Sequence, residues 1–261
     1  MPRFAANLSM LFTEYPFLER FDRATAAGFR AVEFLFPYAE DAAAIRDALS
    51  RNGLEQVLFN LPAGNFAAGE RGLANDPARV EEFRDGVERA LEIADRLSCP
   101  MLNCLIGLEL PGVPIEQQWA TVESNLAYAA EQAEVASVRQ VVEPLNPFDA
   151  PGFLLVSPDQ GFDLVERIGY PNLSVQYDLY HAQRTAGNLT ATIQGRIDRI
   201  GHVQIADSPG RNQPGTGEIN YPFVLAALDA AGYAGWVSLE YKPLGSTEES
   251  LGWLREWGYW T

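Results

Sequence analysis

The chain has 261 residues, of which 47% are hydrophobic, so it has enough apolar mass for one large core and is not disordered. Its 35 acidic and 19 basic residues give a formal net charge of −16, which repels phosphate backbones and argues against a nucleic-acid partner. No run approaches the roughly 20 consecutive apolar residues of a membrane span, so we expect no membrane partner either.

Short β-type runs alternate with helical patterns along the whole chain. The helical pattern is clearest in the segment 78–97, where apolar residues recur at steps of three and four. The predicted strands cover residues 4–10, 31–36, 56–61, 101–107, 139–146, 173–180, 199–206 and 236–242. The predicted helices cover residues 16–27, 41–52, 78–97, 115–136, 158–168, 189–200, 221–231 and 247–257.

This alternation predicts a parallel sheet covered by helices. Glycines such as Gly28 and Gly169 lie where helices should end, which supports the boundaries. Eight units of about 33 residues each favour a single (β/α)8 TIM barrel domain that spans residues 1–261. An open doubly wound sheet is the alternative, but its glycine-rich phosphate loop is missing after the first strand.

Four consecutive predicted strands carry an oxygen donor near their carboxyl ends, where TIM barrels place their active sites. Side-chain alternation directs Glu143, Asp178, Gln204 and Glu240 toward the barrel axis. Three carboxylates and one amide carbonyl suit a hard divalent cation, so we expect Mg²⁺ or Mn²⁺ at these residues. For any one of them, an ion pair or cap at the barrel rim is the alternative.

Cationic and imidazole side chains are predicted around the same rim. His181 follows Asp178 by three residues and is a candidate for binding or polarising the substrate. Arg211, in the glycine- and proline-rich loop 206–221, could meet an anionic substrate, as could Lys242 and Arg71. The alternative for each is an ordinary exposed residue. His202, the second histidine, is expected inside the barrel.

The amino terminus and the cysteines indicate the compartment. No basic region followed by an apolar segment and a cleavage site begins the chain, so we expect a cytoplasmic protein. Cys99 and Cys104 fit neither a redox pair nor a zinc knuckle, and we expect both to be reduced and half-buried. With two histidines and two cysteines in all, a zinc site of the usual kind is hard to build.

Seven segments of the sequence resemble the hydroxypyruvate isomerase family, which belongs to the xylose-isomerase-like barrels. The segments are PRFAANLSMLF, VEFLFPY, NLPAGNFAAGERG, VEPLNPFDAPGF, QYDLYHAQ, GHVQIADSPGRNQPGTGEINY and GWVSLEYKP. The resemblance implies interconversion of hydroxypyruvate and tartronate semialdehyde, with Glu143 and Glu240 as the catalytic pair. It also implies a divalent metal at the four strand ends. The expected partner is therefore a small anionic keto acid.

We expect a glutamate to remove the proton next to the substrate carbonyl and an enediolate to form, stabilised by the metal and His181. Related reactions remain as alternatives: isomerisation of a four-carbon keto sugar acid, or epimerisation of a ketose at C3. A sugar-acid binding protein is the non-enzymatic alternative. An endonuclease-like barrel would need a histidine-rich multi-zinc site and a basic face, which this composition does not offer. The sequence leaves the first base, the metal and a homo-oligomeric state open.

Overall fold

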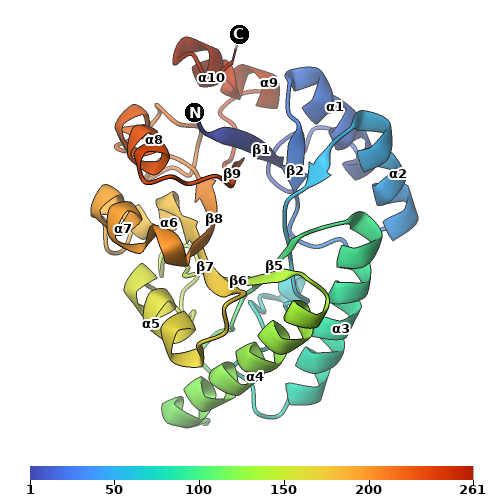
Figure 1. Cartoon of the computed structure of the whole chain (residues 1–261), viewed down its shortest axis with the longest axis vertical. Coiled ribbons are helices and arrows are strands. Elements are labelled where there is room, and N and C mark those ends of the chain that lie inside the picture. Colours follow the sequence, from blue (N-terminus) through green and yellow to red (C-terminus); the bar gives the residue numbers. More distant parts are fainter. Residues whose placement is uncertain (261) are drawn as a thin grey trace.

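Parallel strands form a ring at the centre of the molecule, and the helices surround it in chain order (Figure 1). The computed structural model describes residues 1–260, and Thr261, the last residue of the predicted domain, lies outside the described residues. The strands are β1 (Arg3–Asn7), β2 (Ala31–Glu33), β3 (Glu55–Gln56), β4 (Phe59–Asn60), β5 (Met101–Cys104), β6 (Arg139–Val142), β7 (Leu173–Asp178), β8 (Ile200–Ile205) and β9 (Trp236–Leu239).

The third predicted strand closes the ring. It appears as two short pieces, of which β3 pairs with β2 and β4 pairs with β5. The Asn60 N–H donates to the Leu35 carbonyl at 2.9 Å, and the next N–H, of Leu61, donates to the Asn103 carbonyl at 2.7 Å. One stretch of chain therefore joins both neighbours. The predicted (β/α)8 TIM barrel is confirmed.

The helices lie between successive strands, except the last two, which follow the final strand, and all but one lie close to predicted helices. They are α1 (Arg20–Ala27), α2 (Ala42–Asn52), α3 (Val80–Leu97), α4 (Ile115–Val135), α5 (Pro158–Ile168), α6 (Leu179–Gln183), α7 (Leu189–Arg196), α8 (Tyr221–Ala230), α9 (Thr247–Ser250) and α10 (Gly252–Glu256). Short 3-10 turns cover Phe17–Glu19, Phe66–Ala68 and Ile197–Arg199. Helices α1 and α5 end at Gly28 and Gly169, whose φ angles of 110° and 78° are left-handed, as the sequence predicts.

Most strands are shorter than the sequence predicts. The predicted strand 173–180 ends at Asp178, because the side chain of Asp178 accepts the Tyr180 N–H at 2.8 Å and caps α6. Leu179 and Tyr180 are therefore helical, and their prediction as strand is wrong. The hydrophobic pattern continues past the end of the strand because these side chains are still buried in the core.

Cys99 and Cys104 are both free and fully buried, so the expectation of half-buried thiols is corrected. Burial raises the pKa of each thiol to about 12, which keeps it protonated at neutral pH. They behave as small apolar side chains in the core.

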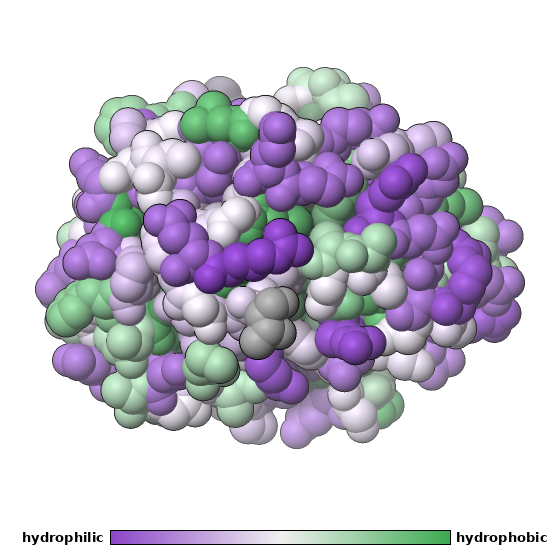
Figure 2. Space-filling view, turned by 90° about the horizontal axis from the view of Figure 1, so that it is seen from above, coloured by the Kyte–Doolittle hydropathy of each residue, from purple (hydrophilic) through white to green (hydrophobic). Residues whose placement is uncertain are grey.

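The outer surface mixes hydrophilic and hydrophobic residues. On the face in Figure 2, hydrophilic residues are widely spread and hydrophobic residues lie in smaller groups between them. Within residues 1–260, none of the helices combines the length and the apolar character that crossing a membrane requires.

The lower half of the barrel interior is held by hydrogen bonds to one buried carboxylate. Glu33 accepts from Asn7 Nδ2 at 2.9 Å and from Gln204 Nε2 at 2.7 Å, and its other oxygen lies 2.8 Å from His202 Nε2. Burial alone would raise the pKa of Glu33, but His202 and these hydrogen bonds lower it. Glu33 is thus an ionised residue whose partners come from β1 and β8.

Glu33→Gln should lower the free energy of unfolding by roughly 1.5–3 kcal/mol, the usual contribution of hydrogen bonds to a charged group. Glutamine removes the negative charge that Asn7, Gln204 and His202 face, and its NH₂ can bond to His202 Nε2 only after the imidazole proton moves to Nδ1. Urea unfolding followed by circular dichroism measures the change. The exposed Glu92→Gln is the matched control and should stay within about 0.5 kcal/mol of wild type. An equally small effect at Glu33 would contradict its assignment as an ionised residue held by hydrogen bonds.

Candidate active site

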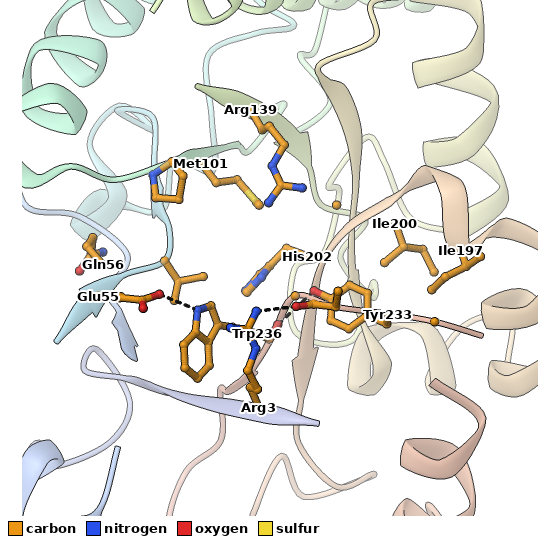
Figure 3. Close-up of a pocket in the computed structure, with 16 residues that line it drawn as sticks. Arg3, Glu55, Gln56, Met101, Arg139, Ile197, Ile200, His202, Tyr233 and Trp236 are labelled. Atoms are coloured by element: carbon orange, nitrogen blue, oxygen red, sulfur yellow. Dashed lines mark hydrogen bonds between the residues drawn. The ribbon is translucent and has the colours of Figure 1, made fainter. Parts of the chain in front are cut away.

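Two cavities lie at opposite ends of the barrel. The larger, about 460 Å³, is at the amino-terminal ends of the strands (Figure 3). There the Arg3 guanidinium lies 4.5 Å from the Trp236 ring centroid, and the indole N–H donates to Glu55 at 3.2 Å. This end of a TIM barrel usually contributes stability rather than chemistry. We therefore place the candidate site in the other cavity, despite its smaller size.

The second cavity, about 260 Å³, opens at the carboxyl ends of the strands. Five of the predicted site residues line it: Arg71, Glu143, His181, Arg211 and Glu240. Asp178 is buried beside them, with Oδ2 3.6 Å from His181 Nε2. The barrel thus brings together side chains that lie up to 169 positions apart in the sequence.

Three buried carboxylates come together at the floor of this cavity. Glu143 follows β6, Asp178 ends β7 and Glu240 follows β9, and each is at most 5% exposed. Burial and the neighbouring Asp178 raise the pKa of Glu143 to about 8. Burial likewise raises the pKa of Asp178 and of Glu240, although Arg211 opposes the shift in both. Uptake of a proton or a cation would relieve the repulsion among these groups.

Arg211 supplies the positive charge among these acids. Its Nη2 lies 2.9 Å from Glu240 and 3.8 Å from Asp178, and its Nη1 lies 3.6 Å from Asp149. Burial opposes the charge of Arg211, but the surrounding carboxylates raise its pKa. Its main chain is left-handed at φ 55°, and its carbonyl accepts the Lys242 N–H at 2.7 Å. The loop after β8 therefore places the guanidinium over the strand ends.

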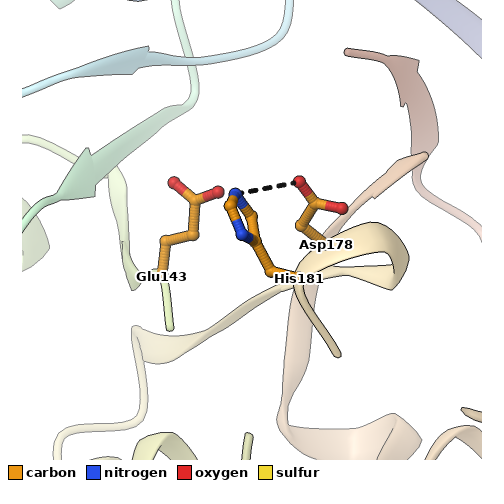
Figure 4. A group of neighbouring side chains, drawn as sticks. All are labelled: Glu143, Asp178 and His181. Atoms are coloured by element: carbon orange, nitrogen blue, oxygen red, sulfur yellow. Dashed lines mark ion pairs between the residues drawn. The ribbon is translucent and has the colours of Figure 1, made fainter. Parts of the chain in front are cut away.

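His181 stands between Glu143 and Asp178 in the first turn of α6 (Figure 4). One suitable atom from each of these three residues lies within 4.8 Å of the others. Burial, together with Arg211 and Arg184, lowers the pKa of His181 well below its usual value, so the ring is neutral. On its other side the ring contacts Asn146, through the main-chain N–H at 3.1 Å and through Nδ2 at 2.6 Å.

Gln204 and Lys242 are placed differently from the other predicted residues. Gln204 lies in register with Asp178, but its carbonyl oxygen accepts from Gln176 at 2.6 Å and its amide donates to Glu33. Coordination of a metal would use the second lone pair of this oxygen or displace Gln176. Lys242 is exposed and contributes its main chain, which contacts the loop that holds Arg211. The structure does not bring the Lys242 side chain to the cavity wall.

Three residues that contact the candidate site are not among the predicted site residues. Asn103 donates to Glu143 at 3.0 Å, Asn146 contacts His181, and Asp149 pairs with Arg211. The sequence from Asn146 to Asp149 reads Asn-Pro-Phe-Asp, a composition typical of a turn led by an Asx side chain. That signal could have ended the predicted strand earlier and singled out Asn146.

The sequence matches known proteins over nearly its whole length. Residues 21–257 match the family model described as xylose isomerase-like TIM barrel. The chain is 49% identical to the protein named hydroxypyruvate isomerase from Escherichia coli (strain K12), over 97% of this chain and 98% of that protein. It is 46% identical to the protein named 2-oxo-tetronate isomerase from Pectobacterium atrosepticum, over 98% of each.

A solved structure is also closely similar. The crystal structure titled AP endonuclease, family 2, from Brucella melitensis superposes with a TM-score of 0.96. The two chains are 46% identical, and the superposition covers 98% of this chain and 99% of that one.

The raised pKa of Glu143 predicts a pH-dependent stability. Because the folded protein holds a proton that the unfolded chain releases above about pH 4.5, this stabilisation is present in acid and is lost as the pH rises toward 8. Glu143→Gln removes the titration. The free energy of unfolding of the variant, minus that of wild type, should therefore be roughly 1–3 kcal/mol larger at pH 8 than at pH 5. Both proteins are measured in EDTA.

Urea unfolding at a series of pH values between these limits measures this difference. Glu92→Gln, an exposed substitution, should keep the wild-type pH dependence. If Glu143→Gln also keeps it, Glu143 does not have a raised pKa in the folded protein.

Proposed function

Because this chain belongs to the xylose isomerase-like TIM barrel family, we propose that it is an isomerase that interconverts hydroxypyruvate and tartronate semialdehyde. One observation carries the proposal: Glu143 and Glu240 face the same small cavity, with His181 and Arg211 beside them. Two carboxyl groups, one neutral imidazole and one guanidinium are the groups that a proton transfer on a small keto acid needs.

The substrate is a small anion, and the cavity contains cations to bind it. Arg211 lies among the carboxylates, and Arg71 forms part of the wall, stacked 4.0 Å from the Phe66 ring centroid. Arg71 is fixed there by hydrogen bonds from Nη1 to the carbonyls of Phe66 and Glu70. A guanidinium held in this way can pair with a carboxylate through two parallel hydrogen bonds. We assign the substrate carboxylate to these arginines.

The reaction moves one proton between neighbouring carbon atoms. A glutamate removes a proton from C3 of hydroxypyruvate, the electron pair forms a C2–C3 double bond, and an enediolate results. A proton returned to C2, with the hydroxyl proton moved from O3 to O2, gives tartronate semialdehyde. Because the reaction runs both ways, Glu143 and Glu240 exchange the roles of base and acid. A pKa of about 8 lets Glu143 exchange protons near neutral pH, and burial raises the pKa of Glu240 in the same direction.

A divalent cation, Mg²⁺ or Mn²⁺, is part of the proposal. The donor set fits it, because three carboxylates are buried together and Asp178 Oδ2 has no hydrogen-bond partner. Glu143, Asp178 and Glu240 would hold the ion, and Gln204 would join them through its carbonyl oxygen. When bound, the ion supplies Lewis-acid stabilisation of negative charge on the substrate oxygens.

A four-carbon keto acid is the second candidate substrate. The Pectobacterium relative is named 2-oxo-tetronate isomerase, and its similarity to this chain is nearly as high as that of the Escherichia coli relative. A cavity of about 260 Å³ has space for either acid. The endonuclease title of the Brucella structure has less support here. The net charge is −16, and of only two histidines in the sequence, His202 pairs with Glu33 inside the barrel.

Glu143→Gln and Glu240→Gln should each lower the rate at which solvent deuterium enters hydroxypyruvate by roughly 10²–10⁴-fold, the usual contribution of a general acid or base. Proton NMR in D₂O follows the exchange. Unchanged circular dichroism shows that each variant is folded, and Glu92→Gln should exchange at the wild-type rate. Near-wild-type exchange in both glutamine variants would remove the two residues from the reaction.

The same measurement separates the alternatives. Faster exchange into a four-carbon 2-oxo acid than into hydroxypyruvate would assign the longer substrate. Epimerisation of a neutral ketose would favour the epimerase, and binding without any exchange would favour a sugar-acid binding protein.

Asp178→Asn should weaken Mn²⁺ binding by at least roughly 10–100-fold, since even the partners of metal ligands contribute that much. Electron paramagnetic resonance of free Mn²⁺ measures the affinity without turnover. EDTA should lower the activity of the wild type, and Mg²⁺ or Mn²⁺ should restore it. Asp163→Asn on the exposed face of α5 is the control and should bind like wild type. Full activity of a verified metal-free protein would overturn the metal's role.

A further inference from the structure

The loop after β6 fixes the orientation of one amide beside the active-site histidine. Asn146 Oδ1 accepts the main-chain N–H of Phe148 at 3.1 Å and that of Asp149 at 3.0 Å. Main-chain N–H groups can only donate, so the oxygen of the Asn146 amide must point at them. The NH₂ group of the amide is therefore the part that faces His181.

Two donors then meet on one nitrogen of the imidazole. The Asn146 main-chain N–H points at His181 Nδ1 from 3.1 Å, and the Asn146 NH₂ lies 2.6 Å from the same atom. A nitrogen that accepts two hydrogen bonds carries no proton. An imidazole with one unprotonated nitrogen holds a single proton, which is therefore on Nε2.

The Nε2–H group is left without a partner inside the barrel. It is buried, makes no hydrogen bond within residues 1–260, and has Asp178 Oδ2 at 3.6 Å, beyond hydrogen-bond distance. An unpaired buried donor lowers stability, so such groups mark places where a partner binds. His181 lines the cavity, and a ligand oxygen there would satisfy the donor.

We propose that Asn146 is a positioning residue that holds His181 in the Nε2–H tautomer, so that the histidine donates a hydrogen bond to a substrate oxygen and neither ligates the metal nor acts as the base. The inference rests on the proposed isomerase activity for the identity of that oxygen, which is the carbonyl or enediolate oxygen of the keto acid. Coordination through Nε2 would need a proton on Nδ1, where two donors already point.

The chain connectivity gives Asn146 a wider role. It follows Glu143 by three residues, so the loop after β6 carries a proposed proton-transfer group and the residue that orients the proposed donor. The turn that Asn146 caps also presents Asp149 to Arg211. One short turn therefore positions the His181 imidazole, the Arg211 guanidinium and the Asp149 carboxylate.

Nitrogen NMR of ¹⁵N-histidine-labelled protein tests the tautomer directly, without substrate. The chain has two histidines, and His181→Gln identifies which signals belong to His181. In wild type we expect an unprotonated Nδ1 and a protonated Nε2. In Asn146→Asp, one carboxylate oxygen keeps the turn and the other faces Nδ1, so Nδ1 becomes protonated. His202, paired with Glu33, should keep its wild-type signals.

The kinetic test compares Asn146→Asp with Asn146→Ala. Alanine removes the NH₂ donor and the turn cap but keeps the main-chain donor, so the tautomer should persist and kcat should fall by less than in Asn146→Asp. Aspartate should lower kcat by roughly 10²–10³-fold, as expected for loss of one donor to a developing oxyanion, with a smaller effect on KM. Asn220→Asp, an exposed helix cap where either residue can cap, adds the same charge and should behave like wild type.

A protonated Nδ1 in wild type would overturn the inference, whatever the variants do. So would an equal or larger loss of kcat in Asn146→Ala, because that pattern indicates only a structural role. If the tautomers behave as expected but wild type catalyses no exchange into keto acids, the proposed function fails and the tautomer assignment stands.

Discussion

Burial of three carboxylates around one guanidinium is the constraint on which the candidate site depends. Glu143, Asp178 and Glu240 are removed from water, and Arg211 offers a single positive charge against them. In such surroundings the ionised form of a carboxyl group is disfavoured, so the pKa values rise. The site therefore gains from taking up protons or a cation. The fold thus creates a need for positive charge at this site. This need supports both the proposed proton transfer and the proposed metal binding.

The interior of the barrel differs sharply between its two levels. At the lower level Glu33 is ionised and fully paired, with partners on β1 and β8. At the upper level Asp178 Oδ2 and His181 Nε2 are buried without hydrogen bonds. Buried polar groups that lack partners lower stability, and proteins tolerate them mainly where a ligand will supply the partner. Glu33 and its partners thus give a rigid base, and the unpaired atoms of Asp178 and His181 mark where substrate and metal would bind.

Part of this site could be predicted from the sequence because side chains along a strand alternate between its two faces with a period of two residues. That period directs Glu143, Asp178 and Glu240 inward once the strands are recognised. The order of the strands around the barrel then brings these three side chains together. The orientation of Gln204 could not be predicted, because its partner Glu33 lies 171 positions away in the sequence. Asn146 was missed for a different reason. Its role depends on a turn that stops the strand, and the apolar pattern alone does not mark that stop.

The tautomer of His181 decides how the imidazole and the neighbouring carboxylates divide their roles. A neutral imidazole beside buried carboxylates would ordinarily turn its donor toward them or ligate the same cation. Here Asn146 fixes the ring from the opposite side, and Asp178 stays too distant to capture the Nε2–H group. The histidine is thereby reserved for a ligand oxygen, while the carboxylates are left to hold protons or metal. The main-chain N–H groups of one turn can only donate, so they fix the orientation of the Asn146 amide. That orientation gives the adjacent side chains their separate roles.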